Sequence, residues 1–181
     1  MIFLYINNGV KVLYPAAKVV LIDPLQLDKM LLIYREINGT TGYEAAGGRV
    51  EVNFQSESAE TFEECAIREI KEEIGVDVKL MSYLGSYTFF WDIKDDTCSS
   101  CVVFLGEIID GVINNENSDL TEIAYEIRWV GISDVLNGCI PVRASHSGLK
   151  PLLIKAAKII KKIDSQTDMK PIIRVLEERL P

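Results

Sequence analysis

The sequence has little of what several common protein classes need. Its 181 residues include one histidine and four cysteines, and only Cys98 and Cys101 lie close together. A zinc knuckle needs a second Cys or His pair. No such pair accompanies these two residues, so reduced thiols in a cytoplasmic protein are the preferred interpretation. No apolar run approaches the roughly 20 residues that cross a bilayer, and we expect no membrane span.

Basic residues are in the minority. Lys and Arg number 19 against 27 Asp and Glu, for a formal net charge of −8. Nucleic-acid coats use Lys and Arg to displace counterions, so we expect no nucleic-acid partner. A small phosphorylated substrate remains compatible with this charge if a divalent cation mediates the contact. The apolar start, Ile2–Ile6, lacks a basic flank and meets Asn7-Asn8-Gly9, which predicts a hairpin turn rather than a signal peptide.

The order of predicted elements indicates an α/β protein. A helical period is predicted over Ser58–Ile74, with Gly75 at C′. The tail predicts two helices, at about 148–163 and 171–180. The remaining apolar segments predict strands: Ile2–Ile6, Val10–Tyr14, Ala17–Ile22, Met30–Arg35, Tyr43–Ala46, Arg49–Val52, Val76–Leu84, Ser86–Trp91, Ser100–Ile109 and Ile127–Val130. We therefore predict one domain over 1–181, with a mixed-sheet core at about 10–140 and a C-terminal helical extension at about 148–180.

Three carboxylates gather on one side of the predicted central helix. At about 100° per residue, Glu69, Glu72 and Glu73 fall within an arc roughly 100° wide at the edge of the apolar stripe. Arg68, Lys71 and Glu64 point toward solvent in this arrangement. Like charges at these spacings repel and raise carboxylate pKa values, and a hard divalent ion would relieve both effects. The alternative is a solvated acidic face, which is what charge runs usually form.

The residues around this helix resemble the Nudix box. Arg68-Glu69-Ile70-Lys71-Glu72-Glu73-Ile74-Gly75-Val76 matches every specified position of its second half, Glu60 stands eight residues before Arg68, and Gly47-Gly48-Arg49-Val50-Glu51 is similar to its opening. The departure lies between these parts. Eleven residues separate Gly48 from Glu60, six more than the five of the pattern, so Val52–Ala59 carries an insertion. Arg128-Trp129-Val130 is similar to the family's late strand.

The resemblance implies a Nudix α/β/α sandwich and metal-assisted water attack on a nucleoside diphosphate. It implies that Glu69, Glu72, Glu73 and the Gly47 carbonyl bind Mg²⁺ or Mn²⁺, and that Glu60 pairs with Arg68. The group that takes the proton stays open. A helix glutamate is one candidate, and Glu116, Glu122 and Glu126 are others. Glu122 is preferred among these three, and the alternative for each of them is an ordinary exposed charge, as acidic residues are mostly exposed.

The substrate is less well defined than the metal site. Arg35 and Arg49 are candidate phosphate contacts or plain surface charges, while Phe89, Phe90 and Trp91 could stack on a base or enter the core. We select Phe90 for the base. Likeness of Tyr43–Gly48 to ADP-ribose and nucleotide-sugar hydrolases favours those substrates. The alternatives are a nucleoside triphosphate or dinucleotide pyrophosphatase, a non-catalytic nucleotide-binding module, and a structural protein with a solvated acidic helix.

Two further expectations concern assembly and the tail. A monomer and a homodimer both remain open from the sequence. The tail alternates apolar residues with lysines, and we expect its apolar stripe to dock on its own domain rather than on a membrane or an acidic partner. His146 precedes this helix; it either forms a loop hydrogen bond, which we favour, or reaches the active site.

Overall fold

The computed structural model describes residues 2–6, 9–37, 40–53, 58–92, 97–114 and 125–177. Nine of the thirteen described elements are strands, and the last element is a long helix. The elements follow in this order: β1 (Ile2–Ile6), β2 (Gly9–Asp23), β3 (Gln26–Ile37), β4 (Thr40–Glu44), β5 (Val52–Asn53), β6 (Ser58–Ala59), α1 (Phe62–Ile74), β7 (Val76–Asp92), β8 (Thr97–Gly111), β9 (Tyr125–Gly131), α2 (Ile132–Leu136), the 3₁₀ segment η1 (Ala144–Leu149) and α3 (Lys150–Glu177).

The main sheet is mixed. Within the described ranges it has seven strands, with the central order β4-β3-β2-β8-β7, β1 beside β2 and β9 beside β3. β2 and β8 run parallel over Val12–Ile22, and the other pairs are antiparallel. β2 and β3 pair close to their connecting turn, at Leu21 with Leu31 and at Asp23 with Gln26.

Beyond that turn β2 takes another backbone partner in place of β3. The Ala17 amide donates to the Gly48 carbonyl over 3.0 Å, and the Val19 amide donates to the Ala46 carbonyl over 2.8 Å. The segment 45–50 therefore crosses from the end of β4 to the edge of β2. This crossing places the two adjacent glycines between the strands and α1.

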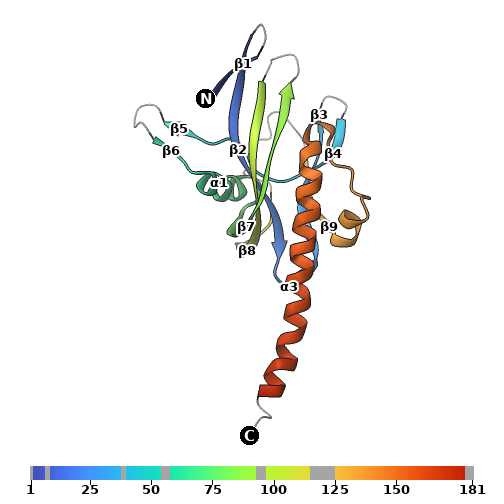
Figure 1. Ribbon diagram of the computed structural model, residues 1–181. Helices are drawn as coiled ribbons and strands as arrows, with labels where there is room; N and C mark the ends of the chain where they lie inside the picture. Colours follow the sequence, from blue (N-terminus) through green and yellow to red (C-terminus); the bar gives the residue numbers. More distant parts are fainter. Residues whose placement is uncertain are drawn as a thin grey trace.

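Helices cover both faces of the sheet (Figure 1). On one face, Ala66, Ile70 and Ile74 of α1 pack against Val19 and Leu21 in one buried cluster. On the other face, Leu153, Ala156 and Ile160 of α3 pack with Val20, Leu32 and Leu105 in a second cluster. Alternation along β2 feeds both clusters, since neighbouring strand residues point to opposite faces. The predicted α/β/α sandwich with a helical extension is confirmed.

The described ends of the insertion at Val52–Ala59 pair as the two arms of a small hairpin. β5 pairs with β6, so that Val52 lies opposite Ala59. The Glu60 amide donates to the Glu51 carbonyl over 3.2 Å, and the Glu51 amide donates to Glu60 Oε1 over 2.7 Å. Glu51 and Glu60, on either side of the hairpin, are therefore in contact. The extra residues lengthen the chain here without displacing the start of α1.

Several predicted boundaries were wrong. The chain through Pro15 belongs to one strand, β2, and the chain through Gly85 belongs to one strand, β7. The helix predicted from Ser58 begins at Phe62, because Ser58 and Ala59 pair in the hairpin. The tail is one helix instead of two. Residues 164–170 contain neither Gly nor Pro, so nothing in them forces a helix to end.

Within the part of the chain that is described, no helix is both long enough and apolar enough to cross a membrane.

Candidate active site

Local signals hold α1 at both ends. Thr61 accepts from the Glu64 amide over 3.1 Å, and the Glu64 carboxylate accepts from the Thr61 amide over 2.7 Å, which forms a capping box. Gly75 ends the helix with φ +85°, and its amide donates to the carbonyls of Ile70 and Lys71. These caps fix where the last two turns of α1, which carry the carboxylates, lie along the sheet.

The two glycines allow the loop to approach the helix and the strand closely. Gly47 has φ +129°, and a Cβ there would lie 2.2 Å from the Ala17 carbonyl oxygen. A Cβ on Gly48 would lie 2.4 Å from the Glu69 carboxyl carbon. Both distances are far inside ordinary contact. Glycine is therefore required at position 47 by the close approach of the β2 backbone, while a side chain at position 48 would displace the Glu69 carboxylate.

Glu73 joins the helix to this turn. Its Oε2 accepts from the Gly47 amide over 2.7 Å, and its Oε1 accepts from Arg35 Nη2 over 2.7 Å. The side chain of Glu73 is 18% exposed and that of Arg35 is 11% exposed. A carboxylate and a guanidinium thus meet at the diglycine turn with little contact with bulk water.

Arg68 organises the other two carboxylates. Its Nη1 lies 2.9 Å from both Glu69 and Glu72. On its other side, Nη2 lies 2.6 Å from Glu60 and donates to the Arg49 carbonyl over 3.0 Å. The prediction that Arg68 points toward solvent was wrong, since its side chain is only 23% exposed. The Arg68 side chain lies along α1 and connects Glu60, at the base of the hairpin, to Glu69 and Glu72.

The pKa directions follow from this arrangement. Burial raises the pKa of Glu69; the hydrogen bond and charge of Arg68 oppose this, and the nearby Glu73 and Glu72 add to it. The hydrogen bond from Arg68 holds the pKa of Glu60 below its usual value. Burial and the adjacent Glu60 and Glu69 raise the pKa of the Cys65 thiol to about 12. Glu60 therefore remains a firm anion, while Glu69 lies in a site that favours an added positive charge.

A second group of charges lies behind the turn, on the α3 side. Glu44 is 3% exposed, and its Oε1 lies 2.8 Å from Arg35 Nε, while its Oε2 lies 2.8 Å from His146 Nε2 and 3.7 Å from Arg143 Nη1. Although burial opposes ionisation, Lys18, the His146 hydrogen bond and Arg35 hold the pKa of Glu44 far below its usual range. Arg35 thus links this buried group to Glu73.

His146 forms the loop hydrogen bonds that we expected of it. Its ring is 1% exposed and lies 4.0 Å from the Phe89 ring, centroid to centroid. Its Nδ1 lies 3.0 Å from Ser145 Oγ, which accepts from Arg143 over 2.9 Å. Nε2 therefore carries the proton toward Glu44 when the ring is neutral. Burial lowers the pKa of His146.

The other predicted site residues are distributed unevenly. Glu72 belongs to the acidic group, but its side chain is 55% exposed. The Arg49 guanidinium lies 4.2 Å from the centre of the Tyr14 ring. Glu126 pairs with Arg128 on β9 and is exposed. Glu116 and Glu122 lie outside the described residues, as does the side chain of Phe90.

Sequence reasoning missed Lys18 and Glu44. Each carried a visible signal, because each is a charged residue next to small apolar residues in a strand segment, in Ala16-Ala17-Lys18-Val19 and Tyr43-Glu44-Ala45-Ala46. Charged residues are seldom fully buried unless paired. A lysine inside an apolar strand therefore predicts a buried partner, although the pattern does not say which residue it is.

The oxygen atoms around the turn suit a hard divalent ion. Glu69 faces Gly48 and Glu73 faces Gly47, so two carboxylates from successive helical turns meet the same two residues. Carboxylates and carbonyls are the ligands that Mg²⁺ and Mn²⁺ prefer. Among the described residues, no three His, Cys, Asp or Glu side chains are already gathered around one point. The donor chemistry of these residues fits a divalent metal. In this structure the carboxylates are paired with Arg35 and Arg68.

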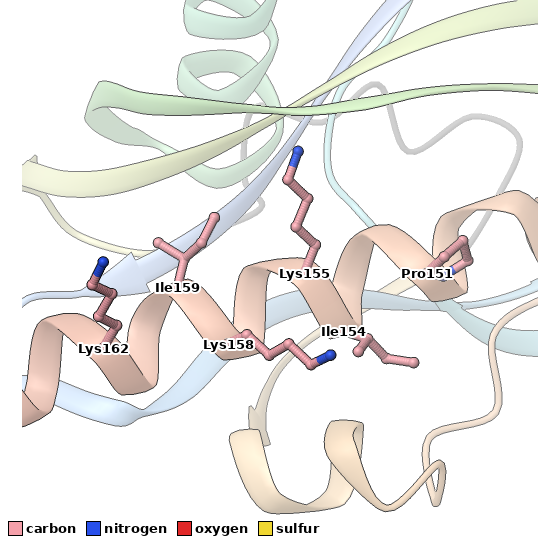
Figure 2. Close-up of a pocket in the computed structure, with 6 residues that line it drawn as sticks. All are labelled: Pro151, Ile154, Lys155, Lys158, Ile159 and Lys162. Carbon is pink, nitrogen blue, oxygen red and sulfur yellow. The ribbon is translucent and has the colours of Figure 1, made fainter.

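A groove elsewhere on the surface has different chemistry. It measures about 400 Å³ and runs along α3, lined by Pro151, Ile154, Lys155, Lys158, Ile159 and Lys162 (Figure 2). Lys155 points toward the strands, where its Nζ donates to the Leu84 carbonyl over 2.8 Å. The groove lies on the face of the sheet opposite α1 and contains no carboxylate. It is therefore separate from the acidic site.

The fold and the site define a class of α/β/α proteins in which helical carboxylates face a diglycine turn. The chain matches the NUDIX domain family model over residues 13–153. It belongs to the Nudix family.

Individual members of the family share low sequence identity with this chain. The chain is 29% identical over 113 residues to the NAD-capped RNA hydrolase NudC of Vibrio atlanticus (strain LGP32), an alignment that covers 62% of this chain and 38% of that protein. The chain thus matches well under half of that relative's length. Among solved structures, MutT protein from Methanosarcina mazei Go1 is similar with a TM-score of 0.57, at 18% identity, covering 82% of this chain and 95% of that one. MutT Nudix hydrolase from Burkholderia pseudomallei is similar with a TM-score of 0.57, at 18% identity, covering 78% and 97%.

Proposed function

We propose that this protein is a metal-dependent hydrolase that cleaves the diphosphate linkage of a nucleoside diphosphate derivative. One observation carries the proposal. Glu69 and Glu73 meet the Gly48 and Gly47 backbone from successive turns of α1, in a half-buried position where an added positive charge is favourable. Membership of the Nudix family supports the same activity.

In this proposal Glu69, Glu73 and the more exposed Glu72 hold Mg²⁺ or Mn²⁺ together with the Gly47 carbonyl. When bound there, a divalent ion would supply charge to neutralise the diphosphate and to lower the pKa of a bound water. Without it, the acidity of the chain would repel an anionic substrate.

The arginines have two kinds of role. Arg68 orients Glu69 and Glu72 while Glu60 holds it in place, since a guanidinium presents several fixed donors at once. Arg35 lies against Glu73, and in this proposal it would contact a phosphate once a bound metal takes over that carboxylate. Arg49 and Phe90 remain proposed substrate contacts, and Glu122 remains the proposed general base.

We also propose a class of substrate. ADP-ribose and nucleotide sugars are favoured by the Tyr43–Gly48 likeness. The NudC relative is named for an NAD cap, which is also a nucleoside diphosphate derivative. A dinucleotide is therefore a second candidate, and a nucleoside triphosphate is a third.

A substrate panel tests the proposal. Purified protein with Mg²⁺ or Mn²⁺ should release a nucleoside monophosphate from ADP-ribose, a UDP-sugar, NADH, a dinucleoside polyphosphate or a dNTP. Glu73→Gln should reduce kcat/KM by about 100-fold or more while leaving the fold intact, because it removes a charged oxygen at the proposed metal. Glu63→Gln is the matched control, since Glu63 lies exposed in the first turn of the same helix.

Three outcomes would contradict the proposal. Wild-type activity in Glu73→Gln would show that the metal site is wrongly assigned. Equal losses in Glu63→Gln would show that the effect is only a change of surface charge. Nucleotide-dependent thermal stabilisation without product, across the whole panel, would instead identify a binding module.

A further inference from the structure

Lys18 is a buried lysine that reaches the backbone of the proposed metal-binding turn. It lies in β2 between apolar neighbours and is 3% exposed. Its Nζ donates to the Ala45 carbonyl over 3.0 Å and to the Gly47 carbonyl over 3.3 Å. One ammonium therefore holds the two carbonyls on either side of Ala46, and one of them is the proposed backbone ligand.

The charge of Lys18 is compensated close by. Glu44 is equally buried, and Lys18 is the foremost charge lowering its pKa. Removing a charged pair from water costs free energy, and apolar residues often replace such pairs without loss of stability. Stability alone therefore gives little reason for a lysine at this point of an apolar strand. The contact with the turn gives a specific one.

The same buried carboxylate also reaches the helix side of the site. Glu44 holds Arg35 Nε at 2.8 Å, and Arg35 Nη2 holds Glu73 at 2.7 Å. Arg35 thus ties the helix to Glu44, while Lys18, bonded to the turn, acts on Glu44 through its charge. The Gly47 carbonyl and the Glu73 carboxylate therefore each contact a cation that acts on the same buried carboxylate.

We propose that Lys18 is a positioning residue that fixes the direction of the Gly47 carbonyl for metal binding, an inference that rests on the proposed metal site. A carbonyl oxygen has two acceptor positions, and Lys18 uses one. Hydrogen bonds from β2 amides hold the carbonyls of Ala46 and Gly48, and Lys18 adds a contact to the Gly47 carbonyl between them. Groups that orient a metal ligand from outside typically change metal affinity by about 10- to 100-fold when removed.

The sequence offers a direct probe of this carbonyl. Gly47-Gly48 is the only pair of adjacent glycines in the chain. Protein labelled with carbonyl-¹³C and amide-¹⁵N glycine gives a single HNCO signal, which reports the Gly47 carbonyl through the Gly48 amide. Titration with Mg²⁺ then measures metal binding at that atom without any substrate.

Lys18→Met should raise the midpoint of this titration by about 10-fold or more. Lys155→Met is the matched control, because Lys155 also donates its Nζ to a backbone carbonyl, that of Leu84, far from the turn. Its midpoint should stay at the wild-type value. An unchanged or lower midpoint in Lys18→Met would overturn the inference, the lower one by showing that Lys18 competes with the metal.

Failure of the proposed function is distinguishable from failure of this inference. If the wild-type Gly47 signal does not respond to Mg²⁺, the proposed metal site is wrong and the inference falls with it. If the wild-type signal responds and the variant responds equally, only the role of Lys18 is wrong. If Lys18→Met does not fold, ¹⁵N-lysine spectra of the wild type decide the question. The Lys18 ammonium signal must shift at saturating Mg²⁺, and a constant signal overturns the inference.

Discussion

The contact between Gly48 and Glu69 makes the site sensitive to a single methyl group. A Cβ at position 48 would lie 2.4 Å from both Cδ and Oε1 of Glu69. Ordinary contact between such atoms needs about 3.5 Å, so Gly48→Ala moves the carboxylate by about 1 Å. Arg68 opposes that movement, because Glu60 and the Arg49 carbonyl hold its other side.

The expected consequence is a large functional loss with a small loss of stability. A displacement of about 1 Å at reacting groups costs on the order of 100-fold in rate. Overpacking by one methyl group costs about 1–3 kcal/mol in the free energy of unfolding. We therefore expect kcat/KM and Mn²⁺ affinity to fall in Gly48→Ala while the protein remains folded. Paramagnetic resonance of free Mn²⁺ measures the affinity, and urea denaturation measures the stability.

Gly138→Ala supplies the control for lost stability. Gly138 has φ +72°, and a Cβ there meets nothing within 4 Å. The substitution strains the backbone by about 1–2 kcal/mol without touching the acidic site. If Gly48→Ala binds Mn²⁺ and turns over as the wild type does, the reasoning about Glu69 is refuted. Equal functional losses in both variants would refute it too.

Three further perturbations test other parts of the structure. His146, the only histidine, has a lowered pKa, so the unfolded chain binds its proton first. The free energy of unfolding should therefore fall as pH drops through about 6.5, by at most about 1.4 kcal/mol per pH unit, and urea titrations of His146→Gln should lack this slope. Arg68→Lys loses the fork that joins Glu60 to the helix, and Mn²⁺ affinity should fall by about 10-fold; wild-type affinity would contradict this role. Deleting 53–58 should leave Mn²⁺ affinity unchanged, because the Glu51–Glu60 contacts close the hairpin; a large loss would show that the hairpin shapes the site.

The central helix could be predicted because its signals are local. Its apolar period, the three glutamates and Gly75 all lie within one stretch of sequence, and each depends on neighbours three or four residues away. The start of the helix was placed too early because Ser58 and Ala59 pair with the other arm of the hairpin. That pairing is a contact between segments, which periodicity does not report.

The charges behind the turn could not be predicted for the same reason. Lys18, Glu44 and His146 are far apart in sequence and meet only because the chain after β4 crosses to β2. Arg35 stays a proposed phosphate contact, and its links to Glu44 and Glu73 could not be read from the sequence. The residue type alone does not reveal whether an arginine binds a ligand or another side chain. Which side chains lie near Arg35 depends on the separation of β2 from β3, which is a property of the whole sheet.

The crossing segment also has a protective role. It pairs with the edge of β2 through Gly48 and Ala46 and through the Val50 amide, which donates to the Pro15 carbonyl over 3.0 Å. Opening the turn would uncover those amides and carbonyls, and an uncovered strand edge invites pairing with another chain. Release of this segment would thus promote self-association. If the segment stays in place, the amides of Ala17 and Val19, which donate to it, should exchange with deuterium as slowly as those of the buried strands.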